Sequence, residues 1–467
     1  MNISMPDPRS VCDLVIAGGR ILDLGGASGV LDDTAIAVRA GIIVAVGTSS
    51  DVDDAWVPTR RIDAAGQAVT PGFVDAHVHL SAFLGAGKPY KSSTGPGLFS
   101  GGGQVEVVLP MVARLCSMPV PSELVAAVVL PILVTMLRSG ITGVVDAGSS
   151  GVDGLVAAAT EVGIRAAIGP SLADMWHDEH GALVRQRDAN QLLANAQDMV
   201  KRHDGAGDGR VRVLISAVET MACSDELLVG IAKLTEECNI PTHVHTHITE
   251  AGVHAHHAAF GKSPTQRLVD SGMLSPRCTA MHAGSLTDQD IITFAEAGVT
   301  VNHNPIGNAM LGFGVTAGRS VPRLLAAGVP IVLGSDYAPF AVSTPFEMIR
   351  AVLMLQRDLA AVDTAVTLEQ ALAMATQAGS SLGRAGQLGR IQVGQIADIV
   401  LVDTTGLHHL GDGHPVPALA LHARAGDVTT VIVDGRVVVE RGVVLGVDEK
   451  VLAAKARQAL KVAAAHG

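Results

Sequence analysis

The sequence predicts an α/β protein in which a (β/α)8 TIM-like barrel carries a small β-sandwich built from both chain ends. Two observations lead to this prediction. In the middle of the chain, short apolar segments alternate with helix-like segments, as in folds with a parallel sheet. At both ends, β-branched runs joined by glycine turns follow one another without helices between them. We therefore expect three stretches: residues 1–70 as the first part of the sandwich, 71–385 as the barrel, and 386–467 as the rest of the sandwich plus a terminal helix.

The two ends resemble each other in composition. Near the N-terminus, Asp13–Leu22 and Ala35–Gly47 are rich in Val, Ile and Ala. Near the C-terminus, Ala397–Asp403 and Val428–Val439 repeat this pattern, and the pair Asp434-Gly435 is a strong signal for a hairpin turn. Such segments favour antiparallel strands, so we expect the two ends to combine into one sandwich.

Eight strand-plus-helix units fit into the middle of the chain, over about 310 residues, a length typical of a (β/α)8 barrel with insertions. An open doubly wound sheet is the alternative. That fold usually carries a G-x-G-x-x-G turn after its first strand, and the sequence has no such turn there. The eight expected barrel strands are Gly72–Leu80, Gly143–Ala147, Arg165–Ile168, Arg210–Ala217, Thr242–Ile248, Cys278–Ala283, Val299–His303 and Pro330–Gly334.

Composition argues against several broad classes. Hydrophobic residues make up 48% of the 467 residues, too many for a disordered chain. The net charge of −12, without a basic run, disfavours a nucleic-acid binder. The apolar stretch Leu124–Leu137 is too short to span a bilayer. The 5 cysteines form no C-x-x-C pair, and the first residues lack a signal-peptide pattern. We therefore expect a cytoplasmic protein with reduced thiols and a small-molecule substrate, without nucleic-acid or membrane partners.

The strongest functional signal is the segment Thr70–Leu80, with the sequence TPGFVDAHVHL. His77 and His79 are two residues apart, so both point to the same face of a strand. At the C-terminal end of a first barrel strand, two imidazoles are placed to bind one metal ion. A lone H-x-H pair is more often a packing feature, but further ligand types follow at the ends of later strands. The metal-binding interpretation is therefore preferred.

The fifth strand lies within Pro241–Glu250, PTHVHTHITE, and offers three histidines on one face. His247 is nearest the C-terminal mouth of the barrel, so we expect it to bind the metal. His243 and His245 are expected to lie deeper, as packing or supporting groups. Glu250 follows where the chain leaves the strand, a position from which a carboxylic acid can reach the substrate as a general acid. An ordinary loop carboxylate is the alternative for Glu250.

Two residues at later strand ends complete the expected site. His282 ends the sixth strand, and Asp336 comes just after the eighth. An aspartate in that position can bind the metal and take a proton from a water that the metal activates. The expected metal ligands are His77, His79, His247, His282 and Asp336, and the expected catalytic residues are Glu250, His282 and Asp336.

These motifs resemble the amidohydrolase superfamily over nearly the whole chain. The resemblance rests on the stretches PGFVDAHVHL, HITE, MHA, HNPIGNAMLG and GSD. It is greatest for the branch that holds cytosine, guanine and adenosine-type deaminases, triazine hydrolases, and phenylurea and thiocarbamate (molinate) hydrolases. It implies one catalytic metal held by the H-x-H pair, the strand-five His and the strand-eight Asp. It further implies Glu250 as the acid, His282 as the group that orients the substrate or the water, and a homo-oligomer.

The fourth strand bears on the number of metal ions. Relatives with two ions usually bridge them with a carboxylated lysine at its end, whereas Arg210–Thr220, RVRVLISAVET, contains no lysine. We therefore expect one divalent ion per chain, with Glu219 as the alternative bridge to a second ion. Nitrogen and oxygen ligands suit zinc first, with cobalt, iron or manganese as alternatives.

Three departures from the deaminase pattern bear on the substrate. Tyr337 follows Asp336 where deaminases commonly have glycine, Val218 stands where adenosine-type relatives carry a pocket histidine, and Pro305–Asn308 lacks a hydroxyl. Each change removes a polar recognition group or adds bulk near the metal. We therefore expect a metal-dependent hydrolase that cleaves a urea-, carbamate-, thiocarbamate- or amide-like bond of a small, weakly polar substrate. The alternatives are a deaminase of an aminated purine, pyrimidine, pterin or triazine, and a non-catalytic scaffold.

Further side chains are expected to line the substrate pocket. Trp176 follows the third strand, and His303 and Asn304 end the seventh; with Val218 and Tyr337 they are the expected substrate contacts. The glycine-rich insertion Gly85–Gly103 is long enough to act as a lid over the mouth, with a solvated or subunit-contact loop as the alternative.

Overall fold

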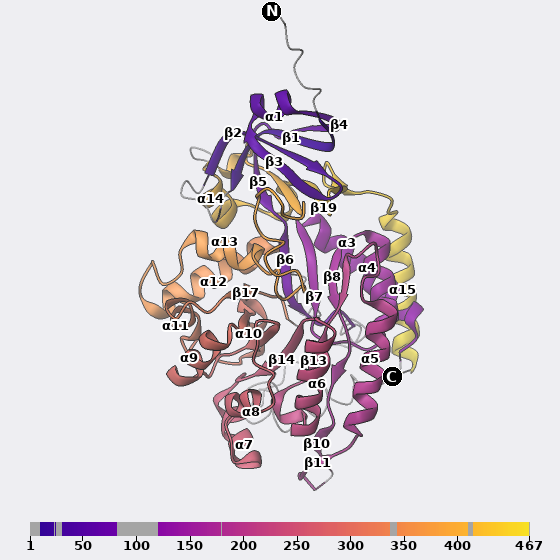
Figure 1. The fold of residues 1–467 in the computed structure, drawn as a ribbon, viewed down its shortest axis with the longest axis vertical. Helices are drawn as coiled ribbons and strands as arrows, with labels where there is room; N and C mark the ends of the chain where they lie inside the picture. The colour runs from indigo at the N-terminus through magenta and orange to yellow at the C-terminus, as the bar shows by residue number, and fades with distance from the viewer. Residues whose placement is uncertain are drawn as a thin grey trace, which may run out of the picture.

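The computed structural model describes residues 10–22, 24, 30–81, 120–178, 180–336, 343–409 and 414–466. The chain forms a barrel with helices around it, and a sheet-rich part made from both chain ends lies against one end of that barrel (Figure 1). The predicted fold class is therefore confirmed. No helix in the described ranges is long and apolar enough to cross a membrane.

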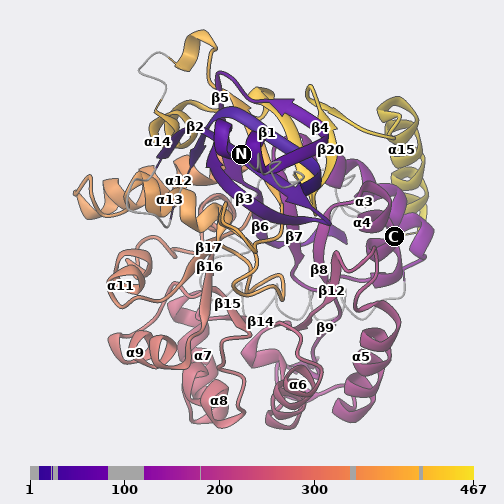
Figure 2. The same cartoon turned by 45° about the horizontal axis from the view of Figure 1, so that its top comes forward.

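The barrel strands are all parallel to their neighbours and form a ring (Figure 2). Two ladders share the ring, with the orders β12-β8-β7-β6 and β17-β16-β15-β14-β13-β9. The fourth barrel strand is split at Leu214, whose N–H donates to Ile168 across the junction of the two ladders, at 3.2 Å. The strands are β6 (Phe73–Val78), β7 (Ile141–Asp146), β8 (Arg165–Ile168), β9 (Ser171–Leu172), β12 (Val211–Val213), β13 (Ile215–Ala217), β14 (Thr242–Thr246), β15 (Cys278–His282), β16 (Thr300–His303) and β17 (Ile331–Leu333).

The ring closes between its first and last strands. The N–H of His79 donates to the carbonyl of Asp336 at 3.0 Å, and the N–H of Asp336 donates to the carbonyl of His77 at 2.8 Å. These two bonds fix residue 336 beside the end of β6. The backbone that closes the barrel is therefore also the backbone of three expected ligands.

Helices form the outer layer, and side-chain caps set where several of them begin (Figure 2). Thr287 with Asp290, and Thr344 with Glu347, form reciprocal capping boxes that satisfy backbone N–H groups at the first turn. The helices are α3 (Ser122–Arg138), α4 (Val152–Val162), α5 (Ala189–His203), α6 (Asp225–Glu237), α7 (Glu250–Phe260), α8 (Pro264–Asp270), α9 (Asp288–Ala297), α10 (Pro305–Leu311), α11 (Ser320–Ala326), α12 (Pro345–Ala360) and α13 (Leu368–Thr376).

One end of the barrel interior is filled with apolar side chains. Residues from the barrel strands pack against the segment that follows α13, and all of these side chains are buried. An apolar plug of this kind closes the interior to water, so polar chemistry is confined to the other end. The plug consists of Val74, Ala76, Val145, Ala167, Leu214 and Val332 from the barrel with Ala378, Leu382 and Leu388 from the segment.

The sheet-rich part is one continuous sheet of nine strands, in which strands of the C-terminal end form one half and strands of the N-terminal end the other. Its order is β21-β20-β19-β18-β5-β1-β2-β3, and β4 also pairs with β1. The strands are β1 (Ser10–Leu22), β2 (Val30–Arg39), β3 (Ile42–Thr48), β4 (Trp56–Asp63), β5 (Gln67–Pro71), β18 (Ile399–Asp403), β19 (Val428–Val433), β20 (Arg436–Glu440) and β21 (Val443–Val444).

Strand β1 forks this sheet. Residues Ser10–Ala17 of β1 pair with β4, and Arg20–Ile21 pair with β5. The fork joins β4 and β5 to the same strand through hydrogen bonds. The predicted hairpin turn is present: Asp434 and Gly435 both have positive φ, 55° and 73°, as a two-residue turn between β19 and β20 requires.

A buried ion pair joins the barrel to the sheet. The guanidinium of Arg165, on β8, donates to both carboxylate oxygens of Asp398 at 2.8 and 3.0 Å, with the two side chains only 2% and 5% exposed. The N–H of Asp434 also donates to Asp398, at 2.8 Å. The C-terminal helix α15 (Glu449–His466) packs along α3, where Arg138 lies 3.1 Å from Glu449 (Figure 1).

We predict that Arg165→Leu lowers the free energy of unfolding by about 3–5 kcal/mol, because it leaves the carboxylate of Asp398 buried without its counter-ion. Urea denaturation followed by circular dichroism measures this. The matched control is Arg436→Leu, which removes an exposed pair with Asp208 and is expected to cost less than about 1 kcal/mol. Equal losses in the two variants would show that burial of the pair is unimportant.

Candidate metal centre

Four histidines and one aspartate converge where β6, β14, β15 and β17 end. The ligand atoms of His77, His79 and His245 lie within 4.8 Å of one another, as do those of His77, His282 and Asp336. His77 Nε2 is 3.3 Å and His79 Nε2 3.6 Å from Asp336 Oδ1. The ring of His245 is centred 4.9 Å from that of His77 and stacks on His79 at 5.4 Å. We call these five residues the strand-end cluster.

The structure differs from the prediction for the fifth strand: it places His245, not His247, in the strand-end cluster. β14 ends at Thr246, and His247 has a φ of 51°, in the left-handed region. The alternation that would put residues 243, 245 and 247 on one face holds only while the strand continues. The ring of His247 lies elsewhere, with Nδ1 2.9 Å from the hydroxyl of Thr246 and Nε2 3.2 Å from that of Thr265.

Glu250 is the first residue of α7 and is exposed, whereas the strand-end cluster is buried apart from His79, which is partly exposed. In the described ranges, no hydrogen bond or ion pair that the structure gives joins this carboxylate to the cluster. The structure therefore does not bring Glu250 to the cluster, because the chain turns away from the barrel mouth at His247. Its role as the acid stays a prediction.

Asn308 fixes the orientation of His282. Its side-chain oxygen lies 2.7 Å from His282 Nδ1, so the Nδ1–H form of the ring is favoured and Nε2 is left for another partner. Asn304 lies 3.5 Å from the same nitrogen, and the ring of Phe313 meets His282 edge-on at 5.4 Å. In the sequence, Asn308 is notable only as the last residue of the segment Pro305–Asn308, which lacks the hydroxyl found in deaminases. Its contact with His282 was not predicted.

The charges in the strand-end cluster suit metal ligands. Burial raises the pKa of Asp336, but the nearby His77 and His282 outweigh this and hold the pKa at about 2. Burial lowers the pKa of His79 to about 3, with a further contribution from His77. Burial likewise holds the pKa of His245 well below its usual range. At neutral pH, His79 and His245 therefore present neutral imidazoles, and Asp336 presents its carboxylate.

Two further buried carboxylates support the backbone around the cluster. Asp75 accepts bonds from the N–H and hydroxyl of Ser335, at 3.0 and 2.6 Å, and burial raises the pKa of Asp75 to about 6. Asp146 accepts from the N–H of Leu80 and the hydroxyl of Ser149. Sequence reasoning missed both, although Asp75 shares the alternating pattern of His77 and His79.

A divalent ion fits the strand-end cluster. Within the described ranges, both ring nitrogens of His77 and one carboxylate oxygen of Asp336 are buried without a hydrogen-bond partner. Such atoms are rare in folded proteins unless another partner satisfies them. Imidazole nitrogens and carboxylate oxygens are the ligands that zinc and neighbouring transition metals prefer. His77, His79, His245 and Asp336 would hold the ion, and His282 lies beside them.

Glu219 does not point to a second ion. Its carboxylate accepts from the N–H of Met221 and the hydroxyl of Thr220, and burial raises its pKa to about 7. Arg267 lies close to it and donates to the carbonyls of Thr220 and Cys223, both at 2.7 Å. Glu219 and Arg267 thus belong to a polar group that holds the turn η3 (Thr220–Ala222) against α8.

The expected substrate contacts divide into two groups. Val218 and Trp176 lie in a small apolar cluster with Ala173, Met221 and Ala222. In the register of β13 and β14, Ala217 is opposite Val244, so the next pair along the strands is Val218 and His245. His303 and Asn304 are buried at the end of β16. Tyr337 and the insertion Gly85–Gly103 lie outside the described residues.

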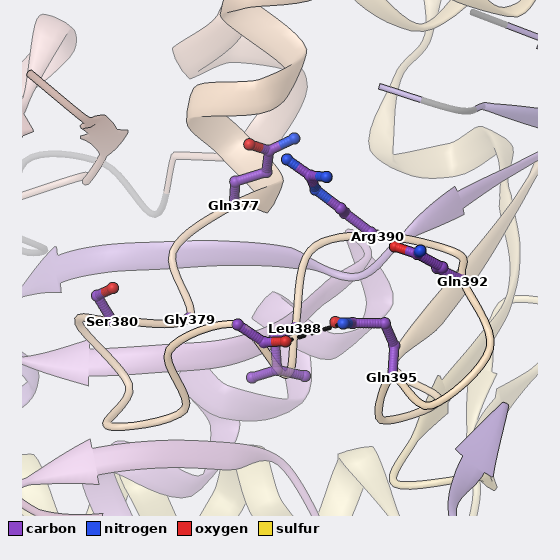
Figure 3. Close-up of a pocket in the computed structure, with 8 residues that line it drawn as sticks. Gln377, Gly379, Ser380, Leu388, Arg390, Gln392 and Gln395 are labelled. Atoms are coloured by element: carbon purple, nitrogen blue, oxygen red, sulfur yellow. Dashed lines mark hydrogen bonds between the residues drawn. The ribbon is translucent and has the colours of Figure 1, made fainter. Parts of the chain in front are cut away.

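A polar cavity of about 270 Å³ lies among residues of the segment after α13 (Figure 3). It is lined by side chains that include Gln377, Arg390 and Gln392, and Gln395 donates to the carbonyl of Gly386 at 2.8 Å. None of its lining residues belongs to the strand-end cluster. The cavity is therefore distinct from the candidate metal centre.

The family follows from a match over most of the chain. Residues 68–438 match the model of the amidohydrolase family. The chain belongs to this family. As a member, it is a metal-dependent hydrolase that acts on C–N bonds, so the scaffold alternative is not supported.

Several relatives of this hydrolase are similar over nearly their whole length. A 5'-deoxyadenosine deaminase of Methanosarcina acetivorans is 28% identical over 452 residues, which is 96% of this chain and 98% of the relative. A 5-methylthioadenosine/S-adenosylhomocysteine deaminase of Syntrophobacter fumaroxidans is 28% identical over 444 residues, 94% of this chain and 96% of the relative.

Solved structures agree with the fold. An adenosine deaminase from Xanthomonas campestris with bound zinc superposes with a TM-score of 0.84 at 26% identity, covering 98% of this chain and 100% of that one. An atrazine chlorohydrolase from Arthrobacter aurescens, complexed with zinc, has a TM-score of 0.83 at 22% identity, covering 96% and 100%, and shows the fold alone.

We predict that His245→Ala loses one bound metal ion per chain relative to the wild type, whereas His247→Ala loses none, because only His245 lies in the strand-end cluster. Metal content per chain, measured by inductively coupled plasma mass spectrometry after zinc loading and desalting, checks this. If His245→Ala keeps the ion and His247→Ala loses it, His247 is the ligand from the fifth strand, as the sequence predicted.

We predict that the wild type loses stability between pH 5 and pH 8 relative to Glu219→Gln. The pKa of Glu219 is raised from 4.5 to about 7, so its contribution is complete below the lower value and is lost as the pH rises through the higher. The expected difference is on the order of 1–3 kcal/mol, from urea denaturation at several pH values. The control is Glu237→Gln, which changes an exposed glutamate and should show the same dependence of unfolding free energy on pH as the wild type. If the unfolding free energies of all three proteins change with pH in parallel, the prediction is contradicted.

Proposed function

We propose that this hydrolase is a deaminase, which replaces the amino group of an aminated heterocycle, of the adenine type, by oxygen. This was the alternative in our sequence analysis, and the relatives favour it over the urea- or carbamate-like bond. Those that align along nearly the whole chain are named as deaminases of adenosine derivatives. The buried strand-end cluster carries the proposal, because it offers the ligands that such a reaction needs at the barrel mouth.

We propose one zinc ion at the strand-end cluster; the adenosine deaminase from Xanthomonas campestris also has bound zinc. When bound, zinc lowers the pKa of a coordinated water from 15.7 to about 7 and so supplies a nucleophile at neutral pH. His77, His79, His245 and Asp336 would hold the ion. Asp336, ionised down to a pH of about 2, takes the proton of the attacking water at its free oxygen and passes it to the leaving amine. The products are the oxo heterocycle and ammonia.

His282 would orient the attacking water. Because Asn308 favours a proton on Nδ1, Nε2 presents a lone pair that accepts a hydrogen bond. Burial lowers the pKa of His282, which keeps the ring neutral. The left-handed backbone of His282 and Asp336, with φ of 67° and 70°, turns both strand ends sharply; residues in this region are uncommon and gather at functional sites.

Hydrolysis of a urea, carbamate or thiocarbamate is the second candidate. The apolar cluster around Val218 and Trp176 favours it, because holding a purine requires several placed hydrogen bonds. The exposed position of Glu250 favours it further, since a leaving thiolate needs no general acid. One panel of substrates separates the two candidates.

The test is product analysis with the full-length, zinc-loaded protein. We would supply adenosine, 5'-deoxyadenosine, an aminotriazine, a phenylurea and a thiocarbamate, and would measure ammonia and product masses. We expect ammonia from an aminated ring and a 10²-fold or greater loss of turnover in Asp336→Asn. Asp363→Asn changes an exposed aspartate and should retain activity. Cleavage only at a urea or thiocarbamate carbonyl would establish the second candidate. A homo-oligomer and a cytoplasmic location stay predictions.

A further inference from the structure

A second group of metal-ligating side chains lies in the sheet-rich part of the chain. It belongs to the crossover between β18 and β19, which contains η4 (Leu407–His409), α14 (Pro415–Pro417), η5 (Ala418–His422) and η6 (Ala425–Asp427). His408 and His409 end η4, and Asp427 ends η6. No residue of this group belongs to the strand-end cluster.

Three ligand atoms of this group meet at one point. His408 Nε2 is 2.9 Å and His409 Nε2 3.3 Å from Asp427 Oδ2, and all three atoms lie within 4.8 Å of one another. Zinc–ligand bonds of about 2.0–2.1 Å in tetrahedral geometry place ligand atoms about 3.3 Å apart. The spacing of the two nitrogens and the oxygen is therefore close to what one ion needs.

We propose that His408, His409 and Asp427 form a second, structural binding site for a zinc-like transition-metal ion. Two imidazoles and a carboxylate are a donor set that such ions favour over calcium or magnesium. The side chain of His409 is 1% exposed, that of Asp427 15% and that of His408 29%. The site is thus backed by protein on one side and open on the other, where water supplies the remaining ligand.

The hydrogen bonding supports an ion at this point. Asp427 Oδ2 also accepts from the N–H of Arg424 at 2.8 Å, so three nitrogens converge on one oxygen. His409 Nδ1 is buried and has no hydrogen-bond partner in the described ranges. Because Nδ1 has no partner among the described residues, the proton of Nε2 can be replaced by one on Nδ1, and Nε2 then offers its lone pair to an ion.

The ion would hold together a long connection. His409 and Asp427 are 18 residues apart, and the crossover between them packs on α12, where Arg350 donates to the carbonyl of Ala423 at 2.8 Å. α12 follows the last barrel strand. Closing this loop with metal bonds removes conformational freedom from the unfolded chain and stabilises the crossover against the barrel.

The experiment counts ions in the full-length protein. In a His77→Ala background, which removes a ligand of the candidate metal centre, we would add His408→Ala, a partly exposed position. The matched control is His422→Ala, whose ring lies 6.4 Å from that of His409 but outside the ligand set. Chelator-stripped proteins would be loaded with Zn²⁺ or Co²⁺, desalted and measured by inductively coupled plasma mass spectrometry and by Co²⁺ absorption.

We expect one ion per chain in the background and in the His422→Ala control, and none with His408→Ala. Zinc should raise the melting temperature of the background but not of the His408→Ala variant, which gives a readout independent of activity. If the background holds no ion, or keeps it after His408→Ala, the proposal is overturned and the group is a hydrogen-bonded cluster only. Neither result depends on which substrate the hydrolase accepts.

Discussion

The candidate metal centre depends on how the barrel closes. The two backbone hydrogen bonds between residue 336 and the end of β6 complete the ring of strands and set His77, His79 and Asp336 side by side. Asp75 strengthens the same junction by accepting two bonds from Ser335. Anything that opens this seam would therefore separate three ligands of the strand-end cluster at once, without touching their side chains.

The cluster is also an electrostatic constraint. It sets an ionised carboxylate near His79 and His245, whose imidazoles burial keeps neutral. Both ring nitrogens of His77 and one oxygen of Asp336 have no protein partner in the described ranges. Unpaired buried polar groups cost about 1–3 kcal/mol each, so this end of the barrel is destabilised unless an ion fills it. The apolar plug at the other end of the barrel and the buried Arg165–Asp398 pair offset this loss of stability.

The sequence predicted the parts of the site that follow from strand periodicity. His77, His79, His282 and Asp336 stand at the ends of strands whose apolar patterns are easily read, so their convergence followed from the barrel. His247 lies outside the strand-end cluster because the left-handed turn at that residue ends β14 at Thr246, two residues before the expected end at Ile248, and a period of two cannot reveal where a strand stops. The fork of the sheet at β1 and the contact of Asn308 with His282 depend on tertiary packing, which a single sequence does not encode in any local pattern.

The pairing of β5 with β18 bears on how the chain reaches its native state. Residues 67–71 find their hydrogen-bond partners at 399–403, and Thr404 bonds to Gly66 across 338 positions of sequence. During synthesis, β5 has one edge unpaired until residues 399–403 have left the ribosome. Unpaired strand edges promote association with other chains, and such distant contacts slow folding. Residues 399–403 must therefore be made before the edge formed by residues 67–71 is protected.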